Sequence, residues 1–145
     1  MTSDPDCLFC RIAAGDLPAT LVHEDESTVA FMDINPATRG HLLVIARNHS
    51  RDLHDADPSD VAAVHQTAQQ MARRLVDALG ADGVNIIQSN GRAAWQTVFH
   101  LHVHVIPRYE DDPLRLPWVP QPGDANEIAA AAAELGATKG ANGVQ

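Results

Sequence analysis

Several features are scarce in this chain, and each scarcity excludes a class of protein. Lysine and arginine together number 10 against 19 aspartates and glutamates, which gives a net charge of -9 with neutral histidines. Proteins that bind nucleic acid polymers usually present a basic face, so we expect no nucleic acid polymer as a partner. No apolar run approaches the roughly 20 residues that cross a bilayer, so we also expect no membrane partner.

A secretory leader and a disulfide framework are also missing from the pattern. Residues 1–6 lack the basic start and the apolar stretch of a signal peptide, so we expect a cytoplasmic protein. The chain has only two cysteines, Cys7 and Cys10. In a reducing compartment, a close pair of this kind indicates metal or redox chemistry rather than a structural disulfide.

The most informative feature that is present is a row of three histidines, His100, His102 and His104, inside the apolar segment 98–106. Side chains alternate faces along a β-strand, so a strand places all three imidazoles on one face. The other face then carries the apolar side chains that can be buried: Phe99, Leu101, Val103 and Val105. Imidazole is the side chain that titrates near neutral pH without help, so we look for the function in this row.

Three interpretations of the row compete. A single metal ion is disfavoured as the partner of all three histidines, because the Cα atoms of His100 and His104 would lie about 13 Å apart on a strand. A solvated face that carries histidines by chance would not account for Gln96 and Thr97 just upstream. We prefer nucleophilic catalysis, in which the central imidazole attacks phosphorus and its neighbours orient and polarise the reacting group.

The helix signals are clearest after residue 56. Asp57 suits an N-cap, Pro58 the first helical position and Asp60 the first turn, and Gly80 is the expected stop. Apolar residues follow at helical spacing: Val61, Val64, Ala68, Met71, Ala72, Leu75 and Leu79. Short helices are expected near the N-terminus, within 6–15, and near the C-terminus, over 124–135.

The remaining apolar segments predict strands. Their expected ranges are 20–23, 28–32, 41–46, 84–88 and 98–106. The sum is an α+β fold: an antiparallel sheet of about five strands, one long helix packed on it, and short N- and C-terminal helices. We expect a single domain over residues 1–135, with a core over 7–108, an irregular C-terminal extension over 109–135, and a disordered tail over 136–145.

The motifs resemble those of the histidine triad (HIT) family. Segment 91–108, which contains the histidine row, is similar to the family signature, and segments 31–36 and 40–45 resemble two upstream motifs at the expected order and distance. The opening segment, 7–12, resembles bacterial-type members of the nucleotide-binding and hydrolase branch that carry Cys-x-x-Cys. The resemblance extends from Cys7 to about Arg108.

This resemblance implies nucleotidyl transfer or hydrolysis at the α-phosphorus of a nucleoside derivative. By position, His102 would be the nucleophile and form a covalent nucleotidyl-imidazole intermediate that water then cleaves. His104 would hydrogen-bond the phosphate oxygens, and His41 would lie against the triad. Gln96 and Thr97 match the pair that contacts the phosphate and the leaving-group side.

The resemblance also implies where the rest of a purine nucleotide would bind. Asp33 and Ile34 match positions that hold the ribose and flank the base, and an aspartate suits a 2′,3′-diol because one carboxylate can accept from both hydroxyls. Ser89 stands where many members have a phosphate-binding asparagine, with Asn90 adjacent. A homodimer is expected, with the long helix and a sheet edge near the interface. The C-terminal segment does not align with the family, and Trp118 is its candidate for shaping the partner subunit's pocket.

Three functions remain open at this point. The first is hydrolysis of nucleoside phosphoramidates or adenylates by a HIT-type nucleotidyl hydrolase. The second is a dinucleoside polyphosphate hydrolase or phosphorylase. The third is a zinc-stabilised nucleotide-binding or interaction module with little turnover.

The cysteine pair raises a separate question of metal binding. Cys-x-x-Cys supplies two tetrahedral zinc ligands and needs two more, for which His49 and His100 are the expected partners and His54 is a substitute for His49. Some family members hold zinc in this way and others lack the cysteines, so the zinc would be structural and catalysis would require no cofactor. The competing interpretations are a redox pair or two reduced buried thiols.

One position departs from the family pattern. The residue before Gln96 is commonly glycine in the family, whereas this chain has Trp95. Glycine permits unusual φ/ψ values that tryptophan adopts only at a cost. We therefore expect either a different loop or an indole that narrows the leaving-group pocket.

Overall fold

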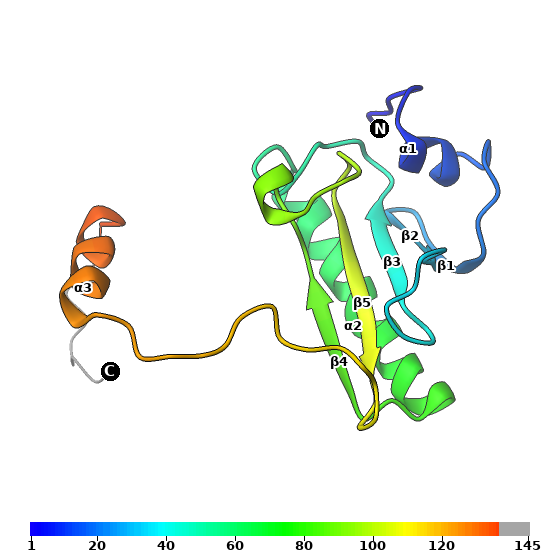
Figure 1. The fold of residues 1–145 in the computed structure, drawn as a ribbon. Helices are drawn as coiled ribbons and strands as arrows, with labels where there is room; N and C mark the ends of the chain where they lie inside the picture. Colours follow the sequence, from blue (N-terminus) through cyan, green and yellow to red (C-terminus); the bar gives the residue numbers. More distant parts are fainter. Residues whose placement is uncertain (137–145) are drawn as a thin grey trace. The chain divides into compact units, whose positions relative to one another are not determined.

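The fold is built on a five-stranded antiparallel sheet in the computed structural model, which describes residues 1–136 (Figure 1). In spatial order the strands are β1 (Leu21–Glu24), β2 (Thr28–Met32), β3 (Leu42–Ala46), β5 (His102–Arg108) and β4 (Gly83–Ile87). Each neighbouring pair is antiparallel. The predicted α+β class and strand number are confirmed.

The long helix α2 (Pro58–Leu79) begins and ends where the sequence predicts. The Asp57 side chain accepts a hydrogen bond from the backbone N–H of Ser59, which satisfies one donor of the first turn. Gly80 ends the helix in the left-handed conformation at φ 67° and donates its N–H to the carbonyl of Val76. Local signals at both ends therefore set the length of the helix.

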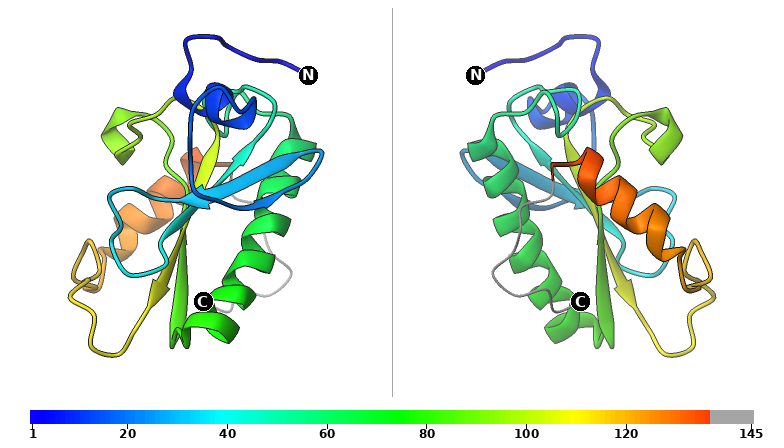
Figure 2. Two further views of the ribbon diagram at one scale, coloured as in Figure 1. Left: turned by 90° about the vertical axis from the view of Figure 1, so that its right-hand side faces the viewer. Right: turned by 90° about the vertical axis from the view of Figure 1, so that its left-hand side faces the viewer.

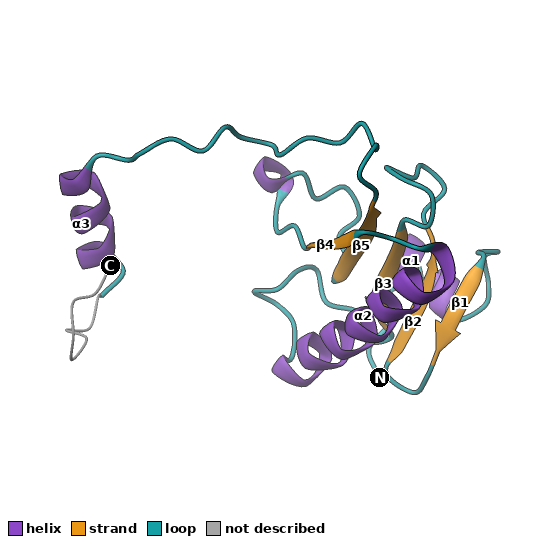
Figure 3. Ribbon diagram, turned by 90° about the horizontal axis from the view of Figure 1, so that it is seen from below, coloured by secondary structure: helices purple, strands orange, loops and turns teal. Residues whose placement is uncertain are grey.

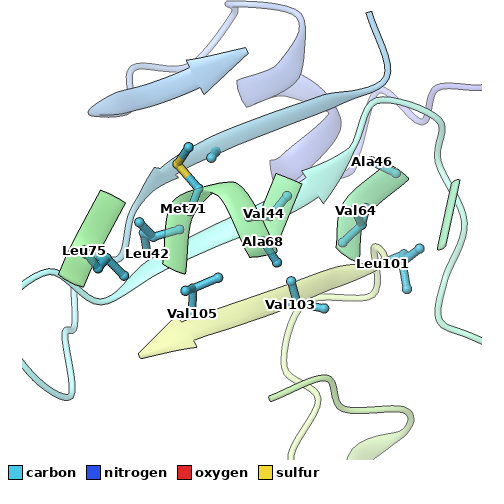
Figure 4. Packing of buried hydrophobic residues seen from close by; sticks show 11 residues of the cluster. Leu42, Val44, Ala46, Val64, Ala68, Met71, Leu75, Leu101, Val103 and Val105 are labelled. Carbon is cyan, nitrogen blue, oxygen red and sulfur yellow. The ribbon is translucent and has the colours of Figure 1, made fainter. Parts of the chain in front are cut away.

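The main hydrophobic core lies between α2 and one face of the sheet (Figures 3 and 4). Helix positions four or three apart point at the sheet, and alternate residues of β3 and β5 point back at the helix. The buried members of this core are Ala30, Leu42, Val44, Ala46, Val64, Ala68, Met71, Leu75, Leu101, Val103 and Val105. The predicted helix face is confirmed, with Val61, Ala72 and Leu79 partly buried at its margin.

The other face of the sheet carries a smaller core around the N-terminal helix α1 (Leu8–Ala13). This core holds the odd-numbered residues of β3 together with the cysteines: Cys7, Phe9, Cys10, Val29, Phe31, Leu43 and Ile45. Because both faces of β3 are covered, all five of its residues are buried, as its uninterrupted apolar sequence predicts. Helix α1 lies at the end of the sheet where β5 begins (Figure 2).

The histidine strand starts later than the sequence predicts. We expected a strand from residue 98, whereas β5 begins at His102. Upstream, the backbone N–H of Leu101 bonds the carbonyl of Ser50 rather than a strand neighbour, and the Gln96 side chain bonds the carbonyl of Val98. Phe99, expected in the core, lies outside both cores and is half-buried beside Arg92.

Residues 1–113 form one compact unit and a second unit begins at Leu114. The second unit contains α3 (Ala125–Glu134), which lies within the predicted range 124–135, and the Asp124 side chain caps its first turn. The single domain over 1–135 stays a prediction, and of the predicted tail, residues 137–145 lie outside the described part of the chain. No helix within residues 1–136 is long and apolar enough to cross a membrane.

Candidate active site and metal centre

A cavity of about 550 Å³ opens on the α1 side of the sheet, and we call it the histidine pocket. Its polar lining consists of Asp33, Asn35, His41, Thr97, His102 and His104. Its apolar lining is larger and includes Leu8, Phe9, Ile12, Leu17, Pro18, Phe31, Met32, Ile34, Leu43 and Val98. An apolar cavity with a few convergent polar groups is the usual form of a small-molecule site.

The hydrogen bond of His102 determines which of its ring nitrogens can react. Its Nδ1 lies 2.6 Å from the carbonyl oxygen of His100. A carbonyl only accepts, so in the neutral ring Nδ1 carries the proton and Nε2 keeps its lone pair. The Phe9 ring packs edge-on against the imidazole at 5.1 Å between centroids. His102 is thus held with an unprotonated nitrogen at the histidine pocket.

His41 and His104 form a second pair with a fixed direction of hydrogen bonding. The backbone N–H of Ala37 donates to His41 Nδ1 at 2.9 Å, so the proton of a neutral His41 lies on Nε2. That Nε2 lies 2.9 Å from His104 Nδ1, which must therefore accept. The proton of a neutral His104 is left on Nε2, where it can be donated to a ligand in the pocket.

Burial keeps these imidazoles neutral at physiological pH. It lowers the pKa of His102, and it lowers the pKa of His41 against the opposing effect of the Asp33 carboxylate. For His104, burial and then the neighbouring His102 and His41 lower the pKa to about 4, again opposed by Asp33. A neutral donor at His104 is therefore available well below pH 7, and burial favours the neutral form of His102.

The structure brings the predicted ribose and base residues, and Thr97 of the predicted leaving-group pair, to the same pocket. One Asp33 oxygen accepts from the N–H of Asn35 at 2.7 Å, and the other lies 3.4 Å from His41 Nε2 and 3.8 Å from His104 Nδ1. Ile34 lines the pocket, and its side chain is almost fully exposed. Thr97, in the loop that precedes β5, also lines the pocket.

The structure does not bring Gln96, Ser89 or Asn90 to the histidine pocket. The Gln96 amide is buried, accepts from the N–H of Gly91 at 2.8 Å and donates to the carbonyls of Arg51 and Val98. Asn90 accepts from the N–H of Leu53 at 2.8 Å and pairs with Gln88, whose side chain also bonds the Ser89 carbonyl. In this structure the Gln96 and Asn90 side chains hold loops together.

Three side chains converge on the first triad histidine, His100, as the sequence predicts. The thiol sulfur of Cys7 lies 3.4 Å from His100 Nδ1, and that of Cys10 lies 3.5 Å from the same nitrogen and 3.4 Å from His49 Nδ1. All four ligand atoms lie within 4.8 Å of one another. His54 is not part of the cluster.

This donor set fits a zinc ion. Zinc–ligand bonds of about 2.0–2.3 Å in a tetrahedron separate sulfur from nitrogen by roughly 3.5 Å, close to the distances found. His100 donates Nε2–H to the carbonyl of Ala46 at 2.6 Å, which leaves Nδ1 free to coordinate. An Asp4 carboxylate lies 3.9 Å from His49 Nε2, the position from which acidic groups orient metal-binding histidines.

Several contributors were missed from the sequence because they act through the backbone or through α1. The carbonyls of Ala46 and His100 and the amide of Ala37 set the three ring orientations. Residue identity carries no signal for a main-chain partner. Leu8 and Ile12 line the pocket from one face of α1, and their four-residue spacing was the available signal.

Comparison with known proteins connects this geometry to a family. The HIT domain model matches residues 14–111. The chain is 43% identical over 106 residues to the HIT-like protein MJ0866 of Methanocaldococcus jannaschii, covering 73% of this chain and 81% of that protein. It is 34% identical to the adenosine 5′-monophosphoramidase hnt1 of Schizosaccharomyces pombe, covering 89% and 95%. It is 39% identical to the adenylylsulfatase HINT3 of Arabidopsis thaliana, covering 77% of this chain and only 56% of that longer protein.

Comparison with solved structures indicates the same family. SMU.412c from Streptococcus mutans matches with a TM-score of 0.87 at 41% identity, covering 92% of this chain and 85% of that one. A zinc-bound histidine triad family protein from Mycobacterium smegmatis matches with a TM-score of 0.74 at 43% identity, covering 90% and 96%. With the family match over residues 14–111 and the three histidines in the matching segment, the chain belongs to the HIT family.

Proposed function

We propose that the protein is a nucleotidyl hydrolase that acts at the α-phosphorus of nucleoside phosphoramidates or adenylates through a covalent intermediate on His102. The observation that carries this proposal is the 2.6 Å contact between His102 Nδ1 and the carbonyl of His100. It leaves Nε2 unprotonated at a pocket of nucleotide size. Two relatives, an adenylylsulfatase and an adenosine 5′-monophosphoramidase, support the substrate class.

The chemistry has two displacement steps. In the first, His102 Nε2 forms a bond to phosphorus, and the bond from phosphorus to the leaving group breaks with its electron pair going to the leaving group. In the second, water attacks phosphorus and loses a proton to solvent, and the bond from phosphorus to Nε2 breaks with its electron pair returning to nitrogen, which regenerates the neutral imidazole. The His102 Nδ1–H group stays hydrogen-bonded to the His100 carbonyl throughout. This hydrogen bond stabilises the imidazolium character of the intermediate.

His104 is the group that stabilises charge on the phosphate. Its Nε2–H is oriented by His41 before substrate arrives, and a donor already aimed at developing charge needs no reorganisation during the reaction. Asp33 would bind the ribose hydroxyls from its exposed side, and the apolar lining would hold a purine base. Thr97 would contact the leaving group.

Two further proposals concern assembly and metal. Zinc bound by Cys7, Cys10, His49 and His100 would have a structural role, since His102 and His104 remain outside that cluster. A homodimer would bury apolar side chains that this chain exposes on the edge strand β4 and on α2: Ile86, Ile87 and Val76.

A trapping experiment tests the function. Wild-type protein mixed with adenosine 5′-phosphoramidate and quenched within milliseconds should carry an adenylyl adduct on His102, detected by intact-protein and peptide mass spectrometry. The His102→Ala variant should show neither adduct nor turnover. Diadenosine polyphosphates are the parallel substrates; preferred turnover of these would favour the polyphosphate hydrolase, and AMP binding without turnover would favour a binding module.

A further inference from the structure

Helix α1 contributes side chains to two different sites. Cys7, at its N-cap, and Cys10 belong to the group of possible zinc ligands, whereas Leu8 and Ile12 line the histidine pocket. Residues three or four apart share one side of an α-helix, so each pair lies on its own side of α1. We call the group of ligands the cysteine cluster; its members are Cys7, Cys10, His49 and His100.

Helix α1 cannot keep its place by its own hydrogen bonds. It has six residues, and isolated helices shorter than about 12 residues are marginal in water. Its end is held by Arg47, which donates to the carbonyl of Ala13 at 3.0 Å, and its middle by Phe9 in the smaller core. At its start the buried anchors are Cys7 and Cys10. The position of the first turn therefore depends on what the two sulfur atoms bind.

The sulfur atoms make only weak contacts as thiols. The sulfur of Cys10 lies 3.5 Å from His100 Nδ1 and 3.4 Å from His49 Nδ1, and a thiol is a weak hydrogen-bond donor. Zinc held by the cysteine cluster would replace these contacts with metal–ligand bonds. Those bonds would join the start of α1 to the segment after β3 and to the segment before β5, and so hold α1 more firmly against the sheet.

A firmly held α1 matters for a ligand in the histidine pocket. Leu8 is 48% exposed and Ile12 is only partly buried beside the smaller core, so few other contacts fix this part of the lining. The part formed by the loop after β2, which includes Ile34, contains no member of α1 or of the cysteine cluster. A ligand binds more tightly when α1 is already ordered, because ordering it no longer adds to the cost of binding.

The nucleophile does not depend on this link. His102 is held by the main-chain carbonyl of His100, which is present whether or not the His100 ring binds a metal ion. Phe9, which packs edge-on against His102, is itself packed against Phe31 with 5.5 Å between ring centroids. We therefore expect the metal to affect the affinity for the ligand and not the chemical step.

We propose that α1 couples the cysteine cluster to the histidine pocket, so that zinc in the cluster and a nucleotide in the pocket each increase the affinity for the other. The proposal rests on the function and the zinc site proposed above. Such coupling is reciprocal: the factor by which zinc lowers the Kd of the nucleotide equals the factor by which the nucleotide lowers the Kd of zinc. Coupled sites typically change each other's affinity by roughly 5- to 150-fold.

The first test measures the Kd of AMP by calorimetry for the zinc-loaded protein and for the metal-free protein with its thiols kept reduced. We expect zinc removal to raise this Kd at least about fivefold, while kcat for adenosine 5′-phosphoramidate changes less than about twofold. Leu8→Ala removes a contact made by α1 and should at least halve the ratio of the two Kd values. Ile34→Ala is the matched control, because it removes a lining residue outside α1; it should weaken AMP binding and leave the ratio unchanged.

A second measurement does not require the metal-free protein to be folded. Zinc release into excess chelator is followed with and without AMP, which is present at about ten times the Kd of each protein so that all are equally saturated. AMP should slow release to the same extent in the wild type and in Ile34→Ala, and at most half as much in Leu8→Ala. Release through global unfolding would be slowed equally in all three, because their saturation is equal.

Equal slowing in Leu8→Ala and Ile34→Ala overturns the coupling, as does a folded metal-free protein whose Kd for AMP lies within about twofold of the zinc-loaded value. Both results leave the hydrolase and the zinc site standing. A wild type that binds no AMP overturns the proposed function, and a wild type that takes up no zinc overturns the zinc site. Each of these last two results also overturns the coupling.

Discussion

The three histidines of the row have the same side chain but three different hydrogen-bond environments. His100 donates from Nε2 to Ala46, His102 donates from Nδ1 to His100, and His104 accepts at Nδ1 from His41. The free nitrogen therefore differs from ring to ring: Nδ1 at His100, facing the cysteines, and Nε2 at His102. At His104 the outward nitrogen carries a proton. One residue type thus supplies a metal ligand, a nucleophile and a donor.

Removing the donor should slow the reaction without abolishing binding. We expect His104→Ala to lower kcat by roughly 100- to 1,000-fold, the range found when one preoriented donor to a developing oxyanion is removed, with KM changed much less. Steady-state kinetics with adenosine 5′-phosphoramidate measures this. His65→Ala, on the exposed face of α2, is the control. A His104→Ala variant with more than half of wild-type kcat would exclude the role.

The free energy of unfolding should decrease at acidic pH because the folded protein holds the His104 ring neutral. The folded pKa of His104 is about 4, below its ordinary value of 6.5, and it is faced by His41, His102 and Asp33. Between these two pH values the unfolded chain binds a proton that the folded chain does not, so stability present above pH 6.5 is lost as pH falls toward 4. Between pH 7 and pH 4.5, protonation of this ring in the unfolded chain should lower the free energy of unfolding by about 2 kcal/mol.

Urea unfolding at several pH values checks this prediction. The His104→Gln variant cannot titrate at this position, so its free energy of unfolding should decrease less over the same range. Equal pH dependence of the two proteins would show that His104 is not held neutral.

At the scale of elements, the end of α2 offers a clean test of a backbone effect. Gly80 has a φ of 67°, and a Cβ added there would meet no atom within 4 Å. Gly80→Ala should therefore cost backbone strain alone, about 1 kcal/mol in the free energy of unfolding, since the unfolded-state entropy gain offsets part of the left-handed penalty.

Gly83→Ala is the comparison, because φ is ordinary there and the nearest atom is 3.9 Å away. It should be neutral or slightly stabilising. Chemical denaturation measures both variants, and a Gly80→Ala protein as stable as Gly83→Ala would contradict the assignment of strain.

Elements set by local signals could be predicted, and those set by distant contacts could not. The ends of α2 follow from Asp57, Pro58 and Gly80, which act on their own neighbourhood. The start of β5 depends on the Ser50 carbonyl, which takes the N–H of Leu101 from about fifty residues away in sequence. An alternating pattern cannot show that such a partner exists.

The same distinction applies to the site. Motif positions led to Asp33, His41, His102 and His104, and the structure brings all four together. The role of Gln96 depends on which way its amide points, and the nearby Gly91, Arg51 and Val98 backbones determine that. The chemical type of a side chain was predictable, whereas its direction required the packed loop.

At the scale of the whole molecule, the proposed zinc site joins three distant parts of the chain. Cys7 caps α1 and Cys10 lies on it, His49 follows β3, and His100 precedes β5. Metal removal by a chelator should therefore lower the unfolding temperature by several degrees, because ligand binding to the folded state alone adds to its stability.

The metal content of purified variants shows whether His49 or His54 is the zinc ligand. Cys7→Ala and His49→Ala should lose stoichiometric zinc by elemental analysis, and His54→Ala should keep it. Metal-free wild type would leave a redox pair or two buried thiols as the interpretation of the cysteines.

The proposed dimer is tested on two exposed apolar residues of similar accessibility. Val76 on α2 is 45% exposed and Leu21 on the opposite edge of the sheet is 46% exposed. Val76→Lys should shift the mass measured by light scattering toward a monomer, because it places a charge in the expected apolar interface, and Leu21→Lys should not. A wild-type monomer, or equal behaviour of both variants, would exclude this interface.

His100 contributes its ring to one centre and its main-chain oxygen to the other. Every amino acid has that oxygen, so exchanging the imidazole for another side chain need not misalign the attacking ring two positions later, provided the turn keeps its path. The cysteine cluster and the phosphorus chemistry can therefore be gained or lost separately in related chains. A lineage could abandon the metal and still keep a working nucleophile.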